Sequence, residues 1–228
     1  MLTIEPPKIV NYKGLAVQYL EGKPGTQTIV IAKGLGIPGK EFEWMYVANL
    51  LGFNVVYAPW GGTWDSEGQF LAKAESALSV TNDVSNLVEL ALREFGGRKD
   101  SRTKSNEVYI AADCFGASPA LVASTRHPEV TRVFTYGGMI YTDDPESNRK
   151  YATPRDAKGE PIDKSIKLGE TLFEHSQQKN GPIFDGYPSL DINVWHRMVR
   201  GETLLNPYKY LPELSQKKYS AWQPKTII

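Results

Sequence analysis

Short apolar runs alternate with amphipathic segments along the first 140 residues. Thr28–Ala32 and residues 54–58 are apolar on both faces, which is typical of buried strands in a parallel sheet. Residues 82–95 carry apolar side chains at helical spacing, which predicts a helix with one buried face. We expect further strands at 15–20, 107–112 and 130–136 and further helices at 41–51 and 115–125. This alternation predicts βαβ units, hence an α/β fold with a mostly parallel sheet and flanking helices.

The pattern changes after residue 140. Residues 141–159 are polar and interrupted by prolines, and helix-like segments follow at 164–178, 192–200 and 208–218. Residues 223–228 have the character of a strand that is just starting. We therefore divide the chain into an α/β core (1–140), a helical region (141–220) and the start of a returning core strand (221–228).

Composition narrows the class of protein. The 228 residues include 26 basic and 26 acidic side chains, and the resulting net charge of zero argues against nucleic acid as a partner. The chain contains no run of about 18 apolar residues, so no membrane-spanning helix is predicted. The N-terminus lacks the pattern of a signal peptide. A single cysteine excludes an intrachain disulfide, and three histidines provide few ligands for a metal site. We expect a compact cytoplasmic protein with no metal and no cofactor.

The turn after strand 107–112 carries the clearest chemical signal. Cys114 lies there, with Ala112 two positions before it and Gly116 two positions after it. A nucleophile on a sharp strand-to-helix turn needs small neighbours at these positions, because the surrounding backbone crowds them. The helix that follows would point its N-terminus at Cys114, which favours a thiolate. A small buried cysteine that only fills the turn is the alternative interpretation.

This turn resembles the nucleophile elbow of the α/β-hydrolase superfamily, and other segments share the resemblance. Residues 33–36 (Lys-Gly-Leu-Gly) stand where the family usually has His-Gly-x-Gly, and residues 57–68 look like the loop after the next strand. Residues 126–130 are similar to the family's usual ending of the elbow helix. The resemblance covers about residues 28–138. It implies an α/β-hydrolase-like fold with a helical lid after the elbow half.

The resemblance also implies a cysteine nucleophile of the kind found in dienelactone hydrolases and polyester synthases. Cys114 would attack an ester, thioester or lactone carbonyl, form an acyl-enzyme and pass the acyl group to water or another acceptor. The backbone amides of Leu35 and Phe115 would form the oxyanion hole. Three positions depart from the family pattern: Lys33 replaces the loop histidine, Ala112 replaces the first glycine of the elbow, and Trp60 replaces the usual aspartate.

Candidates for the base and the acid come after the elbow. His127 is expected at the opposite end of the sheet from Cys114, in a structural role. His175 and His196 fall in the lid-like segments, where a histidine is ordinarily a surface or packing residue; as a base, His196 is favoured over His175. Asp143 and Asp144 follow strand 130–136 and are candidates for the acid, although a turn and helix start explain them equally well.

Two functions remain open on the sequence. The first is an acyl hydrolase or acyltransferase that acts on a small acyl-bearing substrate. The second is a catalytically silent or split relative that acts in binding or assembly. A last strand with nothing after it leaves a sheet edge at the C-terminus open to pairing. Self-association or a complementing chain at that edge would then be expected.

Overall fold

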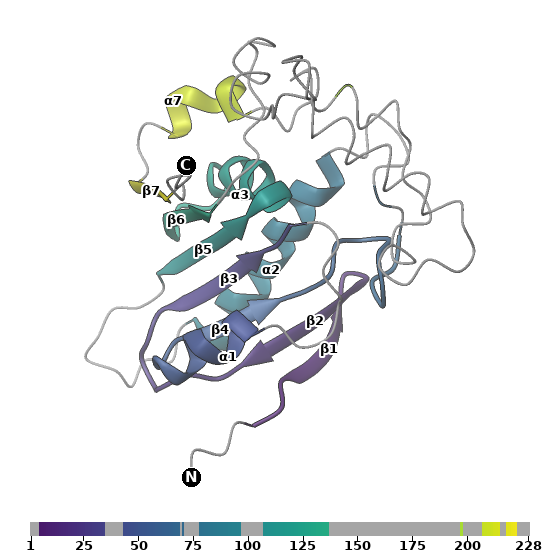
Figure 1. Ribbon diagram of the computed structural model, residues 1–228, viewed down its shortest axis with the longest axis vertical. Coiled ribbons are helices and arrows are strands. Elements are labelled where there is room, and N and C mark those ends of the chain that lie inside the picture. The colour runs from purple at the N-terminus through teal and green to yellow at the C-terminus, as the bar shows by residue number, and fades with distance from the viewer. Residues whose placement is uncertain are drawn as a thin grey trace, which may run out of the picture.

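A twisted sheet of seven strands forms the centre of the protein in a computed structural model (Figure 1). The structure describes residues 5–34, 43–68, 70, 78–96, 107–136, 197, 207–214 and 218–222. The strands are β1 (Lys8–Tyr12), β2 (Leu15–Leu20), β3 (Thr28–Ala32), β4 (Asn54–Tyr57), β5 (Val108–Asp113), β6 (Val130–Tyr136) and β7 (Lys218–Trp222). Their order across the sheet is β1-β2-β4-β3-β5-β6-β7.

The sheet is mostly parallel. β1 and β2 form an antiparallel hairpin and β2 also pairs antiparallel with β4, whereas β4, β3, β5, β6 and β7 pair with their neighbours in parallel. Parallel strands need crossover connections, and described helices lie on those from β3 to β4, from β4 to β5 and from β5 to β6. The predicted α/β class with a mostly parallel sheet and flanking helices is confirmed.

Helices cover both faces of the sheet, and each face has its own apolar cluster. The helical elements are α1 (Glu43–Leu50), α2 (Ser79–Phe95), α3 (Ala117–Ser124) and α7 (Leu211–Leu214), with 3-10 turns η2 (Cys114–Gly116) and η3 (Pro207–Tyr210). The larger cluster packs Val84 and Val88 of α2 and Ala120 of α3 against β3 and β5. On the opposite face Met45 of α1 packs with residues of β2, β3 and β4. None of the described helices is long and apolar enough to cross a lipid bilayer.

Most predicted elements of the core agree with the structure within three residues. β2, β3 and β6 have the predicted bounds, and α2 begins at Ser79, three residues before the predicted start. The predictions did not include β1, a half-exposed edge strand. Its hairpin turn places both Lys13 and Gly14 at positive φ (51° and 83°), the backbone of a tight hairpin.

The predicted helix at 208–218 is wrong in extent. A 3-10 turn and the four-residue helix α7 occupy 207–214, and β7 already begins at Lys218. All of β7, Lys218–Trp222, pairs with β6, so the returning strand starts earlier than 221. The predicted helices at 164–178 and 192–200, and the strand start at 223–228, lie outside the described residues apart from Arg197. The division into core, lid and returning strand stays a prediction.

Candidate active site

Cys114 lies at the carboxyl end of β5, at the centre of the sheet, and its backbone is strained. Its φ of 44° lies in the left-handed region that non-glycine residues rarely adopt. The next residues form the 3-10 turn η2, which leads directly into α3. Such strain is characteristic of functional sites, where the surrounding structure holds a side chain in an unusual position. The half-buried thiol is therefore held at a sharp strand-to-helix turn.

Two glycines allow this turn to form because neighbouring atoms leave no room for a Cβ. A Cβ on Gly116 would lie 2.1 Å from the carbonyl oxygen of Ala32, although the φ of Gly116 is an ordinary −64°. A Cβ on Gly34 would lie 2.8 Å from Cβ of Cys114 and 3.6 Å from its Sγ. The loop after β3 thus touches the cysteine directly. The small residue two positions after Cys114 is a steric requirement, as the sequence pattern indicates.

A buried lysine and a half-buried aspartate stand beside the cysteine. The amide of Gly34 donates a hydrogen bond to Oδ1 of Asp113 over 2.5 Å, which ties the start of the loop to the elbow. Burial lowers the pKa of Lys33 to about 8, against the opposing charges of Asp113 and Glu43. Burial also raises the pKa of Asp113, while the Gly34 amide and the Lys33 charge oppose this. Lys33 and Asp113 thus place opposite charges next to the elbow.

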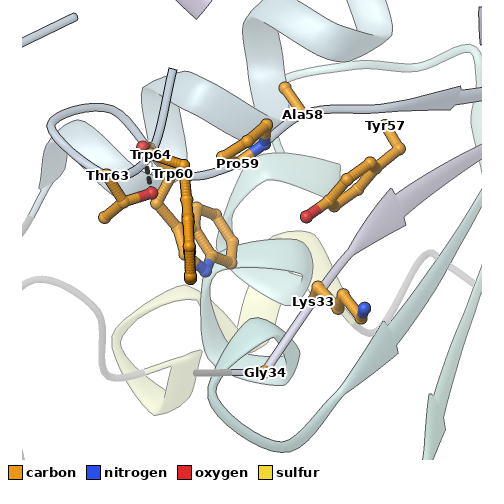
Figure 2. A pocket seen from close by; sticks show the side chains of 8 residues that line it. All are labelled: Lys33, Gly34, Tyr57, Ala58, Pro59, Trp60, Thr63 and Trp64. Carbon is orange, nitrogen blue, oxygen red and sulfur yellow. Dashed lines mark hydrogen bonds between the residues drawn. The ribbon is translucent and has the colours of Figure 1, made fainter. Parts of the chain in front are cut away.

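A small pocket opens beside the elbow (Figure 2). Trp60 and Trp64 lie on one side of it, and Tyr57 and Lys33 lie on the other. The buried ring of Phe115, the residue after the cysteine, packs edge-to-face against Trp60 at 5.4 Å between ring centroids. Aromatic walls of this kind favour an apolar ligand with a few polar contacts. The residues that line the pocket are Lys33, Gly34, Tyr57, Ala58, Pro59, Trp60, Thr63 and Trp64.

The loop that carries the two tryptophans is anchored to α2 by a buried carboxylate. Asp83 is 9% exposed, and its Oδ2 accepts a hydrogen bond from the amide of Gly61 over 2.8 Å. A Cβ on Gly61 would lie 3.3 Å from both carboxylate oxygens, so the approach of loop and carboxylate is close. Burial raises the pKa of Asp83 to about 6, against the effect of the Gly61 amide.

Replacing Asp83 with asparagine is expected to stabilise the protein at neutral pH. Because the pKa of Asp83 is raised by folding, its carboxyl contributes stability that is present below pH 3.8 and lost as the pH rises through about 6. Asparagine retains an acceptor for Gly61 without the charge. The free energy of unfolding of the Asp83→Asn protein should exceed that of the wild type by about 1–3 kcal/mol near pH 7. Below about pH 4 the two values should be almost equal. Urea unfolding of both proteins at these two pH values measures the difference, and an equal difference at both would contradict the prediction.

The structure describes some of the residues proposed from the sequence and not others. Cys114 and Phe115 occupy the elbow as predicted. His127 lies in the turn between α3 and the amino end of β6, at the opposite end of the sheet from Cys114, as expected. The remaining candidates lie outside the described residues: Leu35, Asp143, Asp144, His175 and His196.

Sequence reasoning did not assign a role to three residues that shape the site. Lys33 was visible as a departure from the family pattern, but its burial at 4% exposure was not. Asp83 lies within the predicted amphipathic helix, and a carboxylate on the apolar side of that helix is the signal that marks it. Trp64 has a φ of 51°, and no local sequence pattern indicates a positive φ for a tryptophan.

Comparisons with known proteins agree on the fold. No family model matches the sequence, and a search of curated proteins finds no significant match. Among solved structures, acylaminoacyl peptidase of Pyrococcus horikoshii matches 96% of this chain and 36% of its own, with a TM-score of 0.54 and 15% identity. The Cif epoxide hydrolase from Acinetobacter nosocomialis matches over 95% and 72%, with a TM-score of 0.52 and 12% identity.

A third solved structure covers nearly the whole of both chains. The α/β hydrolase GrgF from Penicillium sp. sh18 matches over 97% of this chain and 91% of its own, with a TM-score of 0.52 and 12% identity. These likenesses, together with the strand order and the elbow at β5, establish that the chain has the α/β-hydrolase fold. The chain spans little more than a third of the length of the Pyrococcus peptidase, 36%.

Proposed function

We propose that the protein is an acyl hydrolase or acyltransferase with Cys114 as its nucleophile. The observation that carries this proposal is the left-handed backbone of Cys114, φ 44°, at the carboxyl end of a central parallel strand. In open α/β sheets, ligands bind outside the carboxyl ends of the strands. A strained cysteine there, beside a pocket, is a candidate nucleophile. The hydrolases among the structural neighbours support this class of reaction.

The surroundings of Cys114 favour the thiolate that the reaction requires. The thiol lies before the N-terminus of α3, where the helix dipole stabilises negative charge. Lys33 adds a positive charge on the neighbouring strand end, where Gly34 contacts Cys114. The thiolate would attack the carbonyl carbon of an ester, thioester or lactone. The leaving alcohol or thiol would depart with a proton, and water would then release the acid and restore the thiol.

The remaining catalytic roles follow the sequence prediction. The backbone amides of Phe115 and Leu35 would donate hydrogen bonds to the developing oxyanion. His196 would serve as the base, and Asp143 or Asp144 would orient it. The small pocket lined in part by Trp60 and Trp64 would lie beside the acyl group of a small substrate.

Turnover and labelling of the full chain test this function together. We expect hydrolysis of short aryl esters and aryl thioesters, and we expect a thiol-directed acylating probe to label Cys114 in the folded protein. Prior labelling should abolish turnover in proportion to the fraction of protein labelled, because the chain has one cysteine. Turnover that persists after complete labelling, or a folded protein that neither turns over nor labels, would contradict the proposal.

One observation favours a second candidate, a relative that acts in assembly. β7 is the last strand of the described sheet, and among the described strands it pairs only with β6. An edge strand with free backbone groups can pair with another chain. A second copy or a complementing chain at this edge would then extend the sheet. Light scattering after size exclusion should give more than one chain per particle if this candidate is correct.

A further inference from the structure

Helix α1 is apolar on the side that faces away from the sheet as well as on the side that packs against it. The inner side carries Met45, which is buried against β2, β3 and β4. The outer side carries four exposed apolar residues: Trp44 (40%), Val47 (56%), Leu50 (52%) and Leu51 (72%), the last directly after the helix. A helix that is apolar on both sides is normally buried on both. The outer side of α1 is therefore a surface that a further contact would cover.

Helix α2, on the opposite face of the sheet, shows the ordinary pattern instead. Its inner side packs Val84 and Val88 into the larger apolar cluster. The positions of α2 that reach solvent are polar: Asn82, Asn86, Glu89 and Arg93. The two helices thus differ in their outer sides, so the exposed apolar residues of α1 are a local feature of this face.

The apolar surface continues from α1 onto β6. The rings of Trp44 and Tyr136 pack edge-to-face with centroids 6.1 Å apart, and Phe134, two positions earlier on β6, is also exposed. Parallel sheets normally have both faces covered. Of the described helices, α1 alone belongs to the apolar cluster on this face, and it packs over β4 rather than β6 (Figure 1). We call Trp44, Val47, Leu50, Leu51, Phe134 and Tyr136 the α1 surface.

Charges of opposite sign stand at the two ends of α1. Glu43 is exposed in the first turn. At the other end, the amide of the exposed Lys23 donates to the carbonyl of Gly52 over 2.9 Å, and the Lys23 side chain lies beside Gly52. Glu21 contacts the same end of α1 through its carbonyl, and its carboxylate is already paired with Lys8 over 2.5 Å. One end of α1 is therefore acidic and the other basic.

We propose that the protein associates with a second copy of itself, through the outer sides of two α1 helices that pack antiparallel across a two-fold axis near Val47. This arrangement buries the apolar stripe of each copy against the other. It also places Glu43 of each copy opposite Lys23 of the second copy and aligns the helix dipoles favourably. A two-fold interface has to be complementary to itself, and a surface with an apolar middle and opposite charges at its ends meets this requirement.

Two further properties of the chain agree with a second copy as the occupant. The formal net charge is zero, so two copies do not repel each other strongly. Trp44 and Tyr136 supply aromatic side chains of the kind that contribute most to protein interfaces. The α1 surface is separate from the edge strand β7, and its use does not depend on the chemistry of Cys114.

Sedimentation of the full chain over a range of concentrations tests the inference. The wild type should form particles of two copies and no larger species. Val47→Glu places a charge at the centre of the interface, and it should raise the dissociation constant at least about a hundredfold, because an unpaired buried charge is costly. Ile9→Glu is the matched control, since Ile9 is 70% exposed on the edge strand β1 and lies outside the α1 surface. It should keep the wild-type dissociation constant.

Exchange of the end charges tests the antiparallel arrangement and does not depend on the Val47 variant folding. Glu43→Lys and Lys23→Glu should each raise the dissociation constant about tenfold at low salt, because like charges then meet at both ends. The double variant, and an equimolar mixture of the two single variants, should return to within about threefold of the wild type. Circular dichroism verifies that each variant is folded.

Three results would overturn the inference. One is a wild type that remains a single chain at about 100 μM. Another is a Val47→Glu protein that folds and associates as the wild type does, which would mean that the copies meet elsewhere, for example at β7. The third is a double charge variant that associates no more tightly than the single variants. None of these results bears on catalysis by Cys114.

Discussion

Cys114→Ala is expected to lower kcat/KM for short aryl thioesters by at least about a thousandfold, because removal of a nucleophile leaves only binding and oxyanion stabilisation. Cys114→Ser should also lose nearly all turnover. A serine hydroxyl at neutral pH is far less nucleophilic than the thiolate proposed for Cys114, which the dipole of α3 and the charge of Lys33 would favour. Initial rates measured with purified variants over a range of substrate concentrations give these values.

The stability of the two variants provides the control. Cys114 is half-buried, and both replacements are as small or smaller, so urea unfolding should give midpoints close to that of the wild type. A variant with normal stability and turnover within tenfold of the wild type would mean that Cys114 only fills the turn. The alternative interpretation, a structural cysteine, would then hold.

Gly116→Ala is expected to destabilise the protein more than any other methyl addition considered for this site. The new Cβ would lie 2.1 Å from the carbonyl oxygen of Ala32, which belongs to the backbone of β3, a strand paired on both sides. The sheet and η2 would have to separate to accept it. We expect a loss of about 3 kcal/mol in the free energy of unfolding, the upper end of the usual cost of overpacking.

Gly14→Ala separates steric overlap from backbone strain. Gly14 has a φ of 83°, but an added Cβ would meet only Glu67, at 3.5 Å. This variant should lose about 1 kcal/mol, the cost of a positive φ at alanine. Urea or thermal unfolding of both variants measures the two effects. A Gly116→Ala protein as stable as Gly14→Ala would show that the elbow does not depend on close packing against β3.

The core strands could be predicted from the sequence because their signal is local. Four of the five residues of β3 are β-branched, and Val30 and Ile31 on its two faces are both buried, which favours apolar side chains on both faces. The sequence patterns of β1 and of the region after residue 207 indicate their secondary structure less clearly. The edge strand β1 is half-exposed and mixes polar with apolar residues, and the residues before β7 form only a short turn of helix where the periodicity suggested a longer one.

The site could be predicted only where its geometry depends on neighbours in the sequence. The small residues around Cys114 indicate the elbow because they lie two positions away. The contact between Asp83 and Gly61 joins residues 22 positions apart on a helix and a loop, and no spacing in the sequence indicates it. The burial of Lys33, and the buried N–H of Trp64 that finds no acceptor in the described part of the chain, depend in the same way on tertiary packing.

The acyl-enzyme itself provides the most direct test of the central claim. The full chain is mixed with an aryl thioester, quenched in acid within the first turnovers and digested, and the peptides are analysed by mass spectrometry. The account predicts the mass of the acyl group on the peptide that contains Cys114, its loss on treatment with neutral hydroxylamine, and no such adduct in Cys114→Ala. Turnover without any adduct on this peptide, or an acyl group on another residue, would contradict it.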